Sequence, residues 1–397
     1  MTHLRIGLWF IGARGGVATT ATLGLLALEQ GHVEPTGLVT ALSPFASLDL
    51  VPWRNFVIGG HDVRCCRMAD TALTLAQSRA LPEVLLDKCW DALNQIESKI
   101  SLGVLFNSGP AIERLVDGEP DRGTARQLIH SIQKDLRAFA RDEELARVVV
   151  VNVASTEPPG DAEQLPGRWA DLDKLLDCDD CPLQASSLYA IAALDLGMAY
   201  INFTPSAGAS LPAIQELATL RETCHAGRDG KTGETLLKSV LAPMFAARNL
   251  DVLSWVGHNI FGNMDARVLD DPVNKASKAR SKDHLLTEIL GYKPQTLVSI
   301  EFIESLADWK TAWDHIHFEG FLGTPMTMQF TWQGCDSLLA APLVLDLVRL
   351  VELSRRCGET GVLRHLGGFF KQPLGLDEAS FWRQTELLEA WAKSHLS

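Results

Sequence analysis

The sequence has no apolar run long enough to span a membrane. Its apolar stretches, such as residues 148–151, are far shorter than the roughly 20 residues that a bilayer requires. The first residues, Met-Thr-His-Leu-Arg, lead directly into a short apolar strand, without the longer apolar core or the small-residue cleavage site of a signal peptide. We therefore expect a cytoplasmic protein with no membrane partner.

Paired cysteines and positive charge are also scarce. The eight cysteines are irregularly spaced, and Cys178 and Cys181 form a lone CxxC without a second pair or a nearby histidine. This pattern favours reduced, structural cysteines and indicates neither a disulfide framework nor a metal site. The formal net charge of −13 argues against nucleic acid as a partner. In such an acidic chain, a local cluster of lysines indicates a site for a small anion.

The length and composition indicate a globular protein of two domains. A chain of 397 residues exceeds what one hydrophobic core usually serves, and its 46% hydrophobic and 21% charged residues are ordinary for a folded chain. We see neither an internal repeat nor a low-complexity tract.

Strands and helices alternate in the first half of the chain. We expect strands at residues 4–11, 37–40, 148–153 and 199–203, a glycine-rich turn at 12–16, and helices at 19–28 and 187–196. The β-branched run at 148–153 is typical of a strand buried on both faces of a parallel sheet. The pattern predicts an α/β fold with a Rossmann-like, doubly wound parallel sheet.

The pattern changes after about residue 227. A helix at 236–247, a strand at 251–256 and a polar segment at 258–271 come before a strand-like stretch at 298–306, an alternating segment at 324–331 and a long apolar helix at 337–353. We interpret residues 235–335 as an antiparallel α+β insert with catalytic and oligomerisation roles. Residues 1–234 and 336–397 would then form the nucleotide-binding domain.

The glycine turn lies where a dinucleotide pyrophosphate would meet backbone N–H groups and a helix N-terminus. It reads Gly12-Ala13-Arg14-Gly15-Gly16-Val17-Ala18, with Arg14 where a glycine is usual. Arg14 could contact a phosphate or point outward, and the turn itself could merely connect two elements. Asp62 could bind the adenosine ribose or be a simple turn aspartate.

Several lysines stand near amides and carboxylates. Lys278 and Lys282 are four residues apart, so on a helix they share one face, which indicates either an anion site or a solvated basic helix. Lys310 follows Asp308, and Lys371 follows two phenylalanines. An apolar environment disfavours an ammonium group, which suits proton transfer or electrophilic catalysis near neutral pH.

Over nearly its whole length the sequence resembles the myo-inositol-1-phosphate synthase family. The matching segments are Gly12 to Thr20, Gly60-His61-Asp62-Val63, Gly227 to Thr235, Asn259 to Asp265, Ser277 to Lys282, Ala307-Asp308-Trp309-Lys310, Cys335 to Ala340 and Phe370 to Leu374. The segment from Gly227 to Thr235 corresponds to the family's Gly-Asp-Asp-x-Lys-Ser-Gly-Gln-Thr. Several motifs in the right order are more specific than any one of them.

The resemblance implies an isomerase with a catalytic NAD. Glucose 6-phosphate would be oxidised at C5, enolised at C6, closed by an aldol step onto C1 and reduced to myo-inositol 1(3)-phosphate. An enolate needs cationic donors where charge develops, and the closure needs both ends of one chain held together. The family resemblance also implies a homotetramer built through the insert.

The resemblance assigns the site residue by residue. The catalytic set is Lys278, Lys282, Lys310, Lys371, Asp229, Asn259, Asp265, Asp308 and Asp336. The cofactor-binding set is Gly12, Ala13, Arg14, Gly15, Gly16, Val17, Ala18, Asp62, Asp229, Thr232 and Asp336. The substrate-binding set is Asn259, Asn263, Lys278, Lys282, Lys310 and Lys371.

Some positions depart from the family's pattern. Arg14 and Ala18 replace glycines, Met264 replaces an asparagine, and residues 202–208 differ from the family's Asn-Gly-Ser-Pro-Gln-Asn-Thr. The substrate could therefore be another sugar phosphate, such as fructose 6-phosphate closing to a five-membered cyclitol phosphate. A third alternative is a nucleotide-binding protein without catalysis, although such a protein has no need of four retained lysines. The choice between NAD and NADP also stays open.

Overall fold

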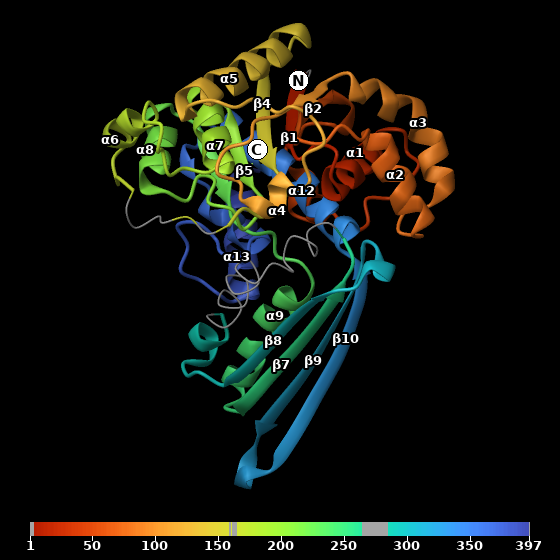
Figure 1. Ribbon diagram of the computed structural model, residues 1–397. Coiled ribbons are helices and arrows are strands. Elements are labelled where there is room, and N and C mark those ends of the chain that lie inside the picture. The colour runs from red at the N-terminus through yellow and green to blue at the C-terminus, as the bar shows by residue number, and fades with distance from the viewer. Residues whose placement is uncertain (1–3, 159, 161–164, 264–284, 397) are drawn as a thin grey trace.

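The computed structural model describes residues 4–158, 160, 165–263 and 285–396. Two sheets organise the chain (Figure 1). The larger sheet has seven strands in the order β11-β6-β5-β4-β1-β2-β3, and every neighbouring pair is parallel. The second sheet has four strands in the order β10-β9-β7-β8 and extends away from the first.

Helices cover both faces of the parallel sheet. The strands are β1 (Ile6–Ile11), β2 (Phe56–Asp62), β3 (Ile100–Leu102), β4 (Arg147–Asn152), β5 (Ala199–Asn202), β6 (Cys224–Gly227) and β11 (Gly361–Val362). One face packs against α1 (Gly16–Glu29), α2 (Met68–Gln77), α3 (Glu83–Glu97), α12 (Asp336–Arg356) and α13 (Phe381–Ser394). The other packs against α5 (Ala125–Asp142), α6 (Trp169–Leu175), α7 (Ala185–Asp195) and α8 (Pro212–Leu220). The predicted doubly wound α/β fold is therefore confirmed.

Strand β1 explains why this sheet needs two helical layers. Leu8 and Phe10 pack into one core, whereas Trp9 and Ile11 pack into the other. Successive side chains of a strand point to opposite faces, so a strand that is apolar at every position must be covered on both sides.

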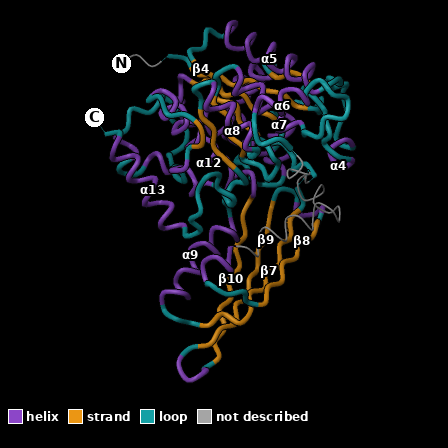
Figure 2. The backbone as a smooth tube through the Cα atoms, turned by 90° about the vertical axis from the view of Figure 1, so that its left-hand side faces the viewer, coloured by secondary structure: helices purple, strands orange, loops and turns teal. Residues whose placement is uncertain are grey.

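The second sheet packs on α9 (Gly233–Ala247) (Figures 1 and 2), and Leu286, from a helical turn at residues 285–290, joins the same core. Its strands are β7 (Asp251–Phe261), β8 (Gln295–Phe302), β9 (Trp309–Glu319) and β10 (Pro325–Cys335). Phe245 of α9 contacts the rings of Trp255 and Phe318 with centroids 6.2 and 4.9 Å apart. These aromatic contacts form a core separate from those of the parallel sheet.

The structure overturns two predictions about these elements. The insert's sheet is mixed, because β7 and β8 pair in parallel while β9 is antiparallel to both β7 and β10. Residues 37–40 do not form a strand, and residues Val39–Ala41 form a short 3₁₀ helix. The Asp346 carboxylate of α12 accepts the N–H groups of Val39 and Thr40 at 2.7 and 2.9 Å, so these donors are not available to a sheet.

The smaller elements complete the path of the chain. They are the 3₁₀ helices Phe45–Ser47, Trp53–Asn55, Glu304–Leu306, Phe321–Gly323 and Arg364–Phe369, and the short helix α4 (Pro110–Glu113). Within the part of the chain that the structure describes, no helix is both long and apolar enough to cross a membrane.

Candidate active site

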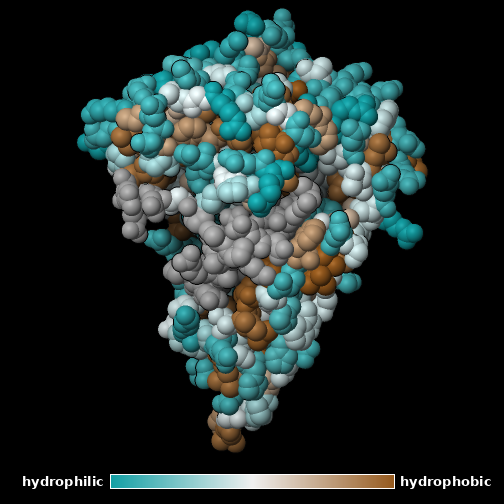
Figure 3. Space-filling model, in the orientation of Figure 1, coloured by the Kyte–Doolittle hydropathy of each residue, from teal (hydrophilic) through white to brown (hydrophobic). Residues whose placement is uncertain are grey.

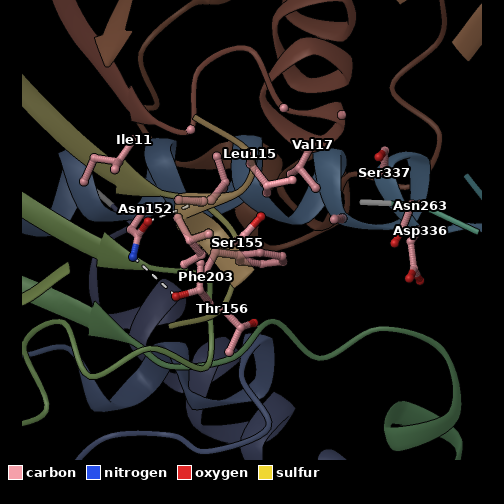
Figure 4. Close-up of a pocket in the computed structure, with 18 of the residues that line it drawn as sticks. Ile11, Val17, Leu115, Asn152, Ser155, Thr156, Phe203, Asn263, Asp336 and Ser337 are labelled. Carbon is pink, nitrogen blue, oxygen red and sulfur yellow. Dashed lines mark hydrogen bonds between the residues drawn. The ribbon is translucent and has the colours of Figure 1, made fainter. Parts of the chain in front are cut away.

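A cavity of about 720 Å³ lies where the two sheets meet, at the carboxyl ends of β1, β2, β4 and β5. In open α/β sheets ligands bind outside the carboxyl ends of the strands, and this volume suits a small-molecule ligand. Figure 4 shows side chains from distant segments converging there, among them Val17, Asn152, Phe203 and Asp336. The cavity is therefore the candidate active site.

The glycine turn forms one wall of the cavity. Gly12, Gly15, Gly16 and Val17 line it. Gly12 has a φ of +82°, and a Cβ there would lie 2.7 Å from the backbone of Ala154. A Cβ on Gly16 would lie 2.4 Å from the hydroxyl of Ser337. Glycine is required at position 12 by its φ and its backbone neighbour, whereas a Cβ at position 16 would force the Ser337 hydroxyl to move. The turn leads into the N-terminus of α1, which favours an anion.

The other predicted turn residues face away from the cavity. Ala13 and Ala18 are fully buried and do not line it. Arg14 is also buried, and its guanidinium lies 2.7 Å from Glu97 and donates to the carbonyls of Arg64 and Ile100. The Arg14 side chain therefore neither lines the cavity nor points outward, and a contact with a phosphate stays a prediction. The Glu97 carboxylate and these two carbonyls bind the Arg14 guanidinium on the side of the turn away from the cavity.

Asp62, at the end of β2, lines the cavity and binds the backbone of the glycine turn. Its carboxylate accepts the backbone N–H groups of Arg14 and Arg64 at 2.8 and 2.9 Å, and the Arg64 guanidinium at 3.2 Å. Asp62 lines the cavity next to the glycine turn. Ribose binding by Asp62 stays a prediction.

Lys310 stands at the start of β9, between two neighbouring strands. It pairs with Phe261 of β7 and with Gly334 of β10 in the sheet register. Its Nζ lies 4.9 Å from the Phe261 ring centre and 3.5 Å from the carboxylate of Asp336, the first residue of α12. Both Lys310 and Asp336 line the cavity, and their catalytic roles stay predictions.

Lys371 reaches the cavity from the segment after the last 3₁₀ helix. Its Nζ donates to the Asp229 carboxylate at 2.9 Å, and its backbone N–H donates to the carbonyl of Asp229 at 2.6 Å. Gly230 and Phe370 form an isolated bridge beside this pair. Residues 142 positions apart in the sequence are thereby held together at the cavity wall.

Asp308 is buried where the insert joins α12. Its carboxylate accepts the backbone N–H and the hydroxyl of Ser337, both at 3.1 Å, and the thiol of Cys335. Burial raises the pKa of Asp308 above its usual value, against the effect of these donors. Asp308 therefore ties the insert to the start of α12 and, through Ser337, to the glycine turn.

The amides and hydroxyls predicted for the site also line the cavity. Asn259 comes from β7, Asn263 from the residues after it, and Thr232 from the residue before α9. Asn259 is buried and donates to the carboxylate of Glu234. Three predicted residues, Lys278, Lys282 and Asp265, lie outside the described residues.

Residues 202–208, which depart from the family's pattern, form another wall. Phe203 stands where that pattern has glycine, and its ring lies over Gly230, where a Cβ would approach it to 2.1 Å. The ring centre is 6.5 Å from that of Phe370. A benzyl side chain therefore fills space between the Asp229–Lys371 pair and the end of β5.

Sequence analysis assigned no role to four charged side chains in or beside this site. Glu157 and Glu234 line the cavity, whereas Lys231 and Lys238 are buried next to lining residues. Lys231 donates to Gln384 of α13, and burial, followed by the nearby Lys371 charge, lowers its pKa to about 8. Glu234 and Lys238 form a buried ion pair, which their spacing of four residues on a helix could have indicated. No spacing could have indicated Glu157, because its partners Ser186 and Ser206 are distant in sequence.

Glu157 gives the protein a pH-dependent stability. Burial raises its pKa to about 7, although Ser186 donates to the carboxylate through its backbone N–H at 2.9 Å and through its hydroxyl. The unfolded chain releases this proton near pH 4.5, whereas the folded protein keeps it until about pH 7. Glu157 therefore stabilises the fold at low pH, and this contribution is lost as the pH rises to about 7.

Replacing Glu157 by glutamine should remove that dependence. The difference in free energy of unfolding between wild type and Glu157→Gln is expected to shift by about 2–3 kcal/mol in favour of the variant from pH 4.5 to 7.5. Urea unfolding at several pH values measures it. Parallel pH profiles for the two proteins would show that Glu157 does not titrate as described.

Within the described part of the chain, no group of three or more His, Cys, Asp or Glu side chains is arranged to hold a metal ion.

Comparisons with known proteins identify the family. The chain matches the family model described as myo-inositol-1-phosphate synthase over residues 6–393. Inositol-3-phosphate synthase 1 of Bacteroides thetaiotaomicron is 31% identical, with 93% of this chain and 90% of that protein covered. Inositol-3-phosphate synthase 1 of Oryza sativa is 28% identical, with 89% and 75% covered.

Solved structures agree with this assignment. Inositol-3-phosphate synthase of Caenorhabditis elegans has a similar fold, with a TM-score of 0.89 at 22% identity, over 99% of this chain and 86% of that one. A myo-inositol-1-phosphate synthase-related protein from Thermotoga maritima gives a TM-score of 0.80 at 25% identity, over 98% and 99%. The chain therefore belongs to the myo-inositol-1-phosphate synthase family.

Proposed function

We propose that the protein converts glucose 6-phosphate to myo-inositol 1(3)-phosphate with a catalytic NAD. One observation carries the proposal. A single cavity is walled on one side by a glycine turn fit for a dinucleotide and on another by two lysine–carboxylate pairs, Lys310–Asp336 and Lys371–Asp229. Family membership and the names of the relatives support the same reaction.

The glycine turn fits a dinucleotide. Gly12 and Gly16 let the turn pack closely against Ala154 and Ser337, and Gly15, Gly16 and Val17, at the start of α1, line the cavity. Asp62 stands at the end of the neighbouring strand, where it could accept from ribose hydroxyls. NAD, when bound, would accept a hydride from C5 of the substrate and return it at the end of the cycle.

The lysine pairs suit the carbon chemistry. Once C5 is a ketone, the protons on the neighbouring C6 are more acidic. Removal of one of them places negative charge on the C5 oxygen. Lys310 and Lys371 would place ammonium groups at that oxygen, and Asp336 and Asp229 would hold them in position. By the family resemblance Lys278 would act with them, and Lys282 would bind the phosphate.

This mechanism predicts redox balance. Because the hydride returns to the carbon skeleton, turnover of glucose 6-phosphate should produce cyclised product with no net NADH. Absorbance at the NADH band is followed while substrate loss is measured in the same sample. Release of one NADH per substrate consumed would instead make the protein an ordinary dehydrogenase.

We also propose a tetramer assembled through residues 235–335. The sheet of this segment has α9 on one face, and the connection between β9 and β10 carries Phe321 and Leu322, each 87% exposed. Figure 3 shows an apolar cap at the lower end of the molecule, where Figure 1 places this connection. Such exposed apolar groups favour contact with another copy of the chain. Light scattering should give four times the 43.4 kDa mass of one chain. A single-chain mass at micromolar concentration would rule this assembly out.

A further inference from the structure

Arg64 follows the carboxyl end of β2 and lines the cavity beside the glycine turn. A Cβ on Gly15 would lie 3.9 Å from the Arg64 Nη2, so the guanidinium stands against the segment that leads into α1. The Arg64 side chain is 22% exposed. A half-buried cation therefore lies at the part of the cavity wall where the proposed dinucleotide would bind.

The Asp62 carboxylate is already occupied by two arginines. Its Oδ1 accepts the backbone N–H of Arg64 at 2.9 Å and the Arg64 Nε at 3.2 Å. Its Oδ2 accepts the backbone N–H of Arg14 at 2.8 Å and the Arg64 Nη2 at 3.4 Å. A carboxylate has about four acceptor sites, so a ribose hydroxyl would have to compete with Arg64 for Asp62. A carboxylate at this place in the fold selects NAD by binding the 2′-hydroxyl, whereas a nearby arginine accommodates a 2′-phosphate.

The Arg64 backbone is held at both of its polar groups. Its N–H donates to Asp62, and its carbonyl accepts from the Arg14 Nη1 at 2.6 Å. Arg14 is held in turn by Glu97, 2.7 Å away. The residue that replaces a glycine of the family's turn therefore supports the backbone of Arg64, which reduces the conformational freedom that this segment would lose on binding a ligand.

The charges around Arg64 are paired. The ion pairs are Arg64–Asp62, Arg14–Glu97 and Arg67–Asp70. Asp117, another nearby carboxylate, accepts the backbone N–H of Cys65, is exposed and does not line the cavity. The two carboxylates on this part of the cavity wall, Asp62 and Asp70, each have an arginine partner, which lowers their repulsion toward an anion.

We propose that Arg64 makes the adenosine end of this site accept a ribose with a 2′-phosphate, so that the protein binds NADP as well as NAD. Among the described residues, the guanidinium uses Nε and Nη2 for Asp62, which leaves the Nη1 donors for phosphate oxygens. The planar fork of arginine suits such oxygens. The inference rests on the proposed function and names a second cofactor for the same site.

Titration calorimetry on the nucleotide-free protein tests the proposal. The wild type should bind NADP with a dissociation constant within about tenfold of that for NAD. Arg64→Met removes the charge and keeps an apolar stem, so it should weaken NADP binding by about 10- to 100-fold, as expected for a lost charge-assisted hydrogen bond. NAD should bind to this variant as tightly as before or more tightly, because Asp62 becomes free to accept the 2′-hydroxyl.

Adenosine fragments locate the effect on the ligand. Adenosine 5′-monophosphate and adenosine 2′,5′-bisphosphate differ only in the 2′-phosphate, and only the bisphosphate should lose affinity in Arg64→Met. Arg64→Lys keeps the charge without the planar fork, so its affinity for NADP should lie between those of the wild type and Arg64→Met.

Arg126 on α5 provides the matched control. Its side chain is 28% exposed, lies 2.7 Å from Asp173 and does not line the cavity. Arg126→Met should therefore leave both affinities unchanged. If Arg64→Met does not fold, Arg64→Gln, which can still donate to Asp62 but carries no charge, is measured in the same way.

The outcomes distinguish this inference from the proposed function. A wild-type protein that binds NAD and holds NADP outside the stated range would overturn the inference and leave the proposed function standing. An equal loss of affinity for both dinucleotides in Arg64→Met would also overturn it, because Arg64 would then only support the turn. A protein that binds neither dinucleotide would overturn the proposed function and the inference together.

Discussion

Replacing Lys371 or Lys310 by alanine should lower kcat by about 100- to 1000-fold, the usual cost of removing a preorganised donor at developing charge. Each lysine is held by a carboxylate, Lys371 by Asp229 at 2.9 Å and Lys310 by Asp336 at 3.5 Å. Alanine would leave the backbone contact between Lys371 and Asp229 intact, so the loss should reflect the missing ammonium group. Steady-state rates at saturating substrate measure the effect.

The control for this experiment is a lysine far from the cavity. Lys393 on α13 is 63% exposed, pairs with Glu389 of the same helix and does not line the cavity, so Lys393→Ala should keep wild-type turnover. For Lys282, which the family resemblance assigns to phosphate binding, alanine should act mainly on KM. Near-full turnover in both Lys310→Ala and Lys371→Ala would show that the chemistry occurs elsewhere.

The second large effect concerns the glycine turn. Gly16→Ala should weaken NAD binding by about ten- to a hundredfold, because the new Cβ would lie 2.4 Å from the Ser337 hydroxyl. The Ser337 hydroxyl donates to Asp308, so moving it away from the new Cβ would break that hydrogen bond and disturb the contact between the turn and the start of α12. Titration of NAD against intrinsic fluorescence measures the affinity.

Gly24→Ala is the matched control in the same helix. A Cβ at Gly24 would meet only Leu345 at 3.8 Å, an ordinary van der Waals contact. Alanine there should keep NAD affinity and raise the free energy of unfolding by up to about 1 kcal/mol, through helix propensity. Equal NAD affinity in the two variants would contradict the role given to Gly16.

Local sequence patterns predicted much of this fold. The β-branched run of β4 (Arg147–Asn152) and the alternation of apolar and polar residues in β10 (Pro325–Cys335) were sufficient to predict these two strands. A strand buried on both faces is apolar throughout, whereas a strand buried on one face alternates. Residues 37–40 were misassigned because their backbone donors bind Asp346, about 300 residues away. No local sequence pattern indicates a hydrogen bond between segments so far apart in the chain.

Motifs singled out Lys310, Lys371 and Asp308, which the fold brings to one cavity, and their roles stay predictions. The sequence did not reveal that Arg14 binds Glu97, because that pairing depends on the packing of α3 beneath the turn. The sequence did not indicate Glu157 either, because its raised pKa depends on burial and on the hydroxyls of Ser186 and Ser206, which lie in two other segments.

The most direct test of the central claim is the identity of the product. The protein with NAD is incubated with carbon-13-labelled glucose 6-phosphate and, separately, with labelled fructose 6-phosphate, and the phosphorylated products are identified by NMR. We expect a six-membered inositol phosphate from glucose 6-phosphate. A five-membered cyclitol phosphate formed from fructose 6-phosphate, with glucose 6-phosphate left unchanged, would contradict the account.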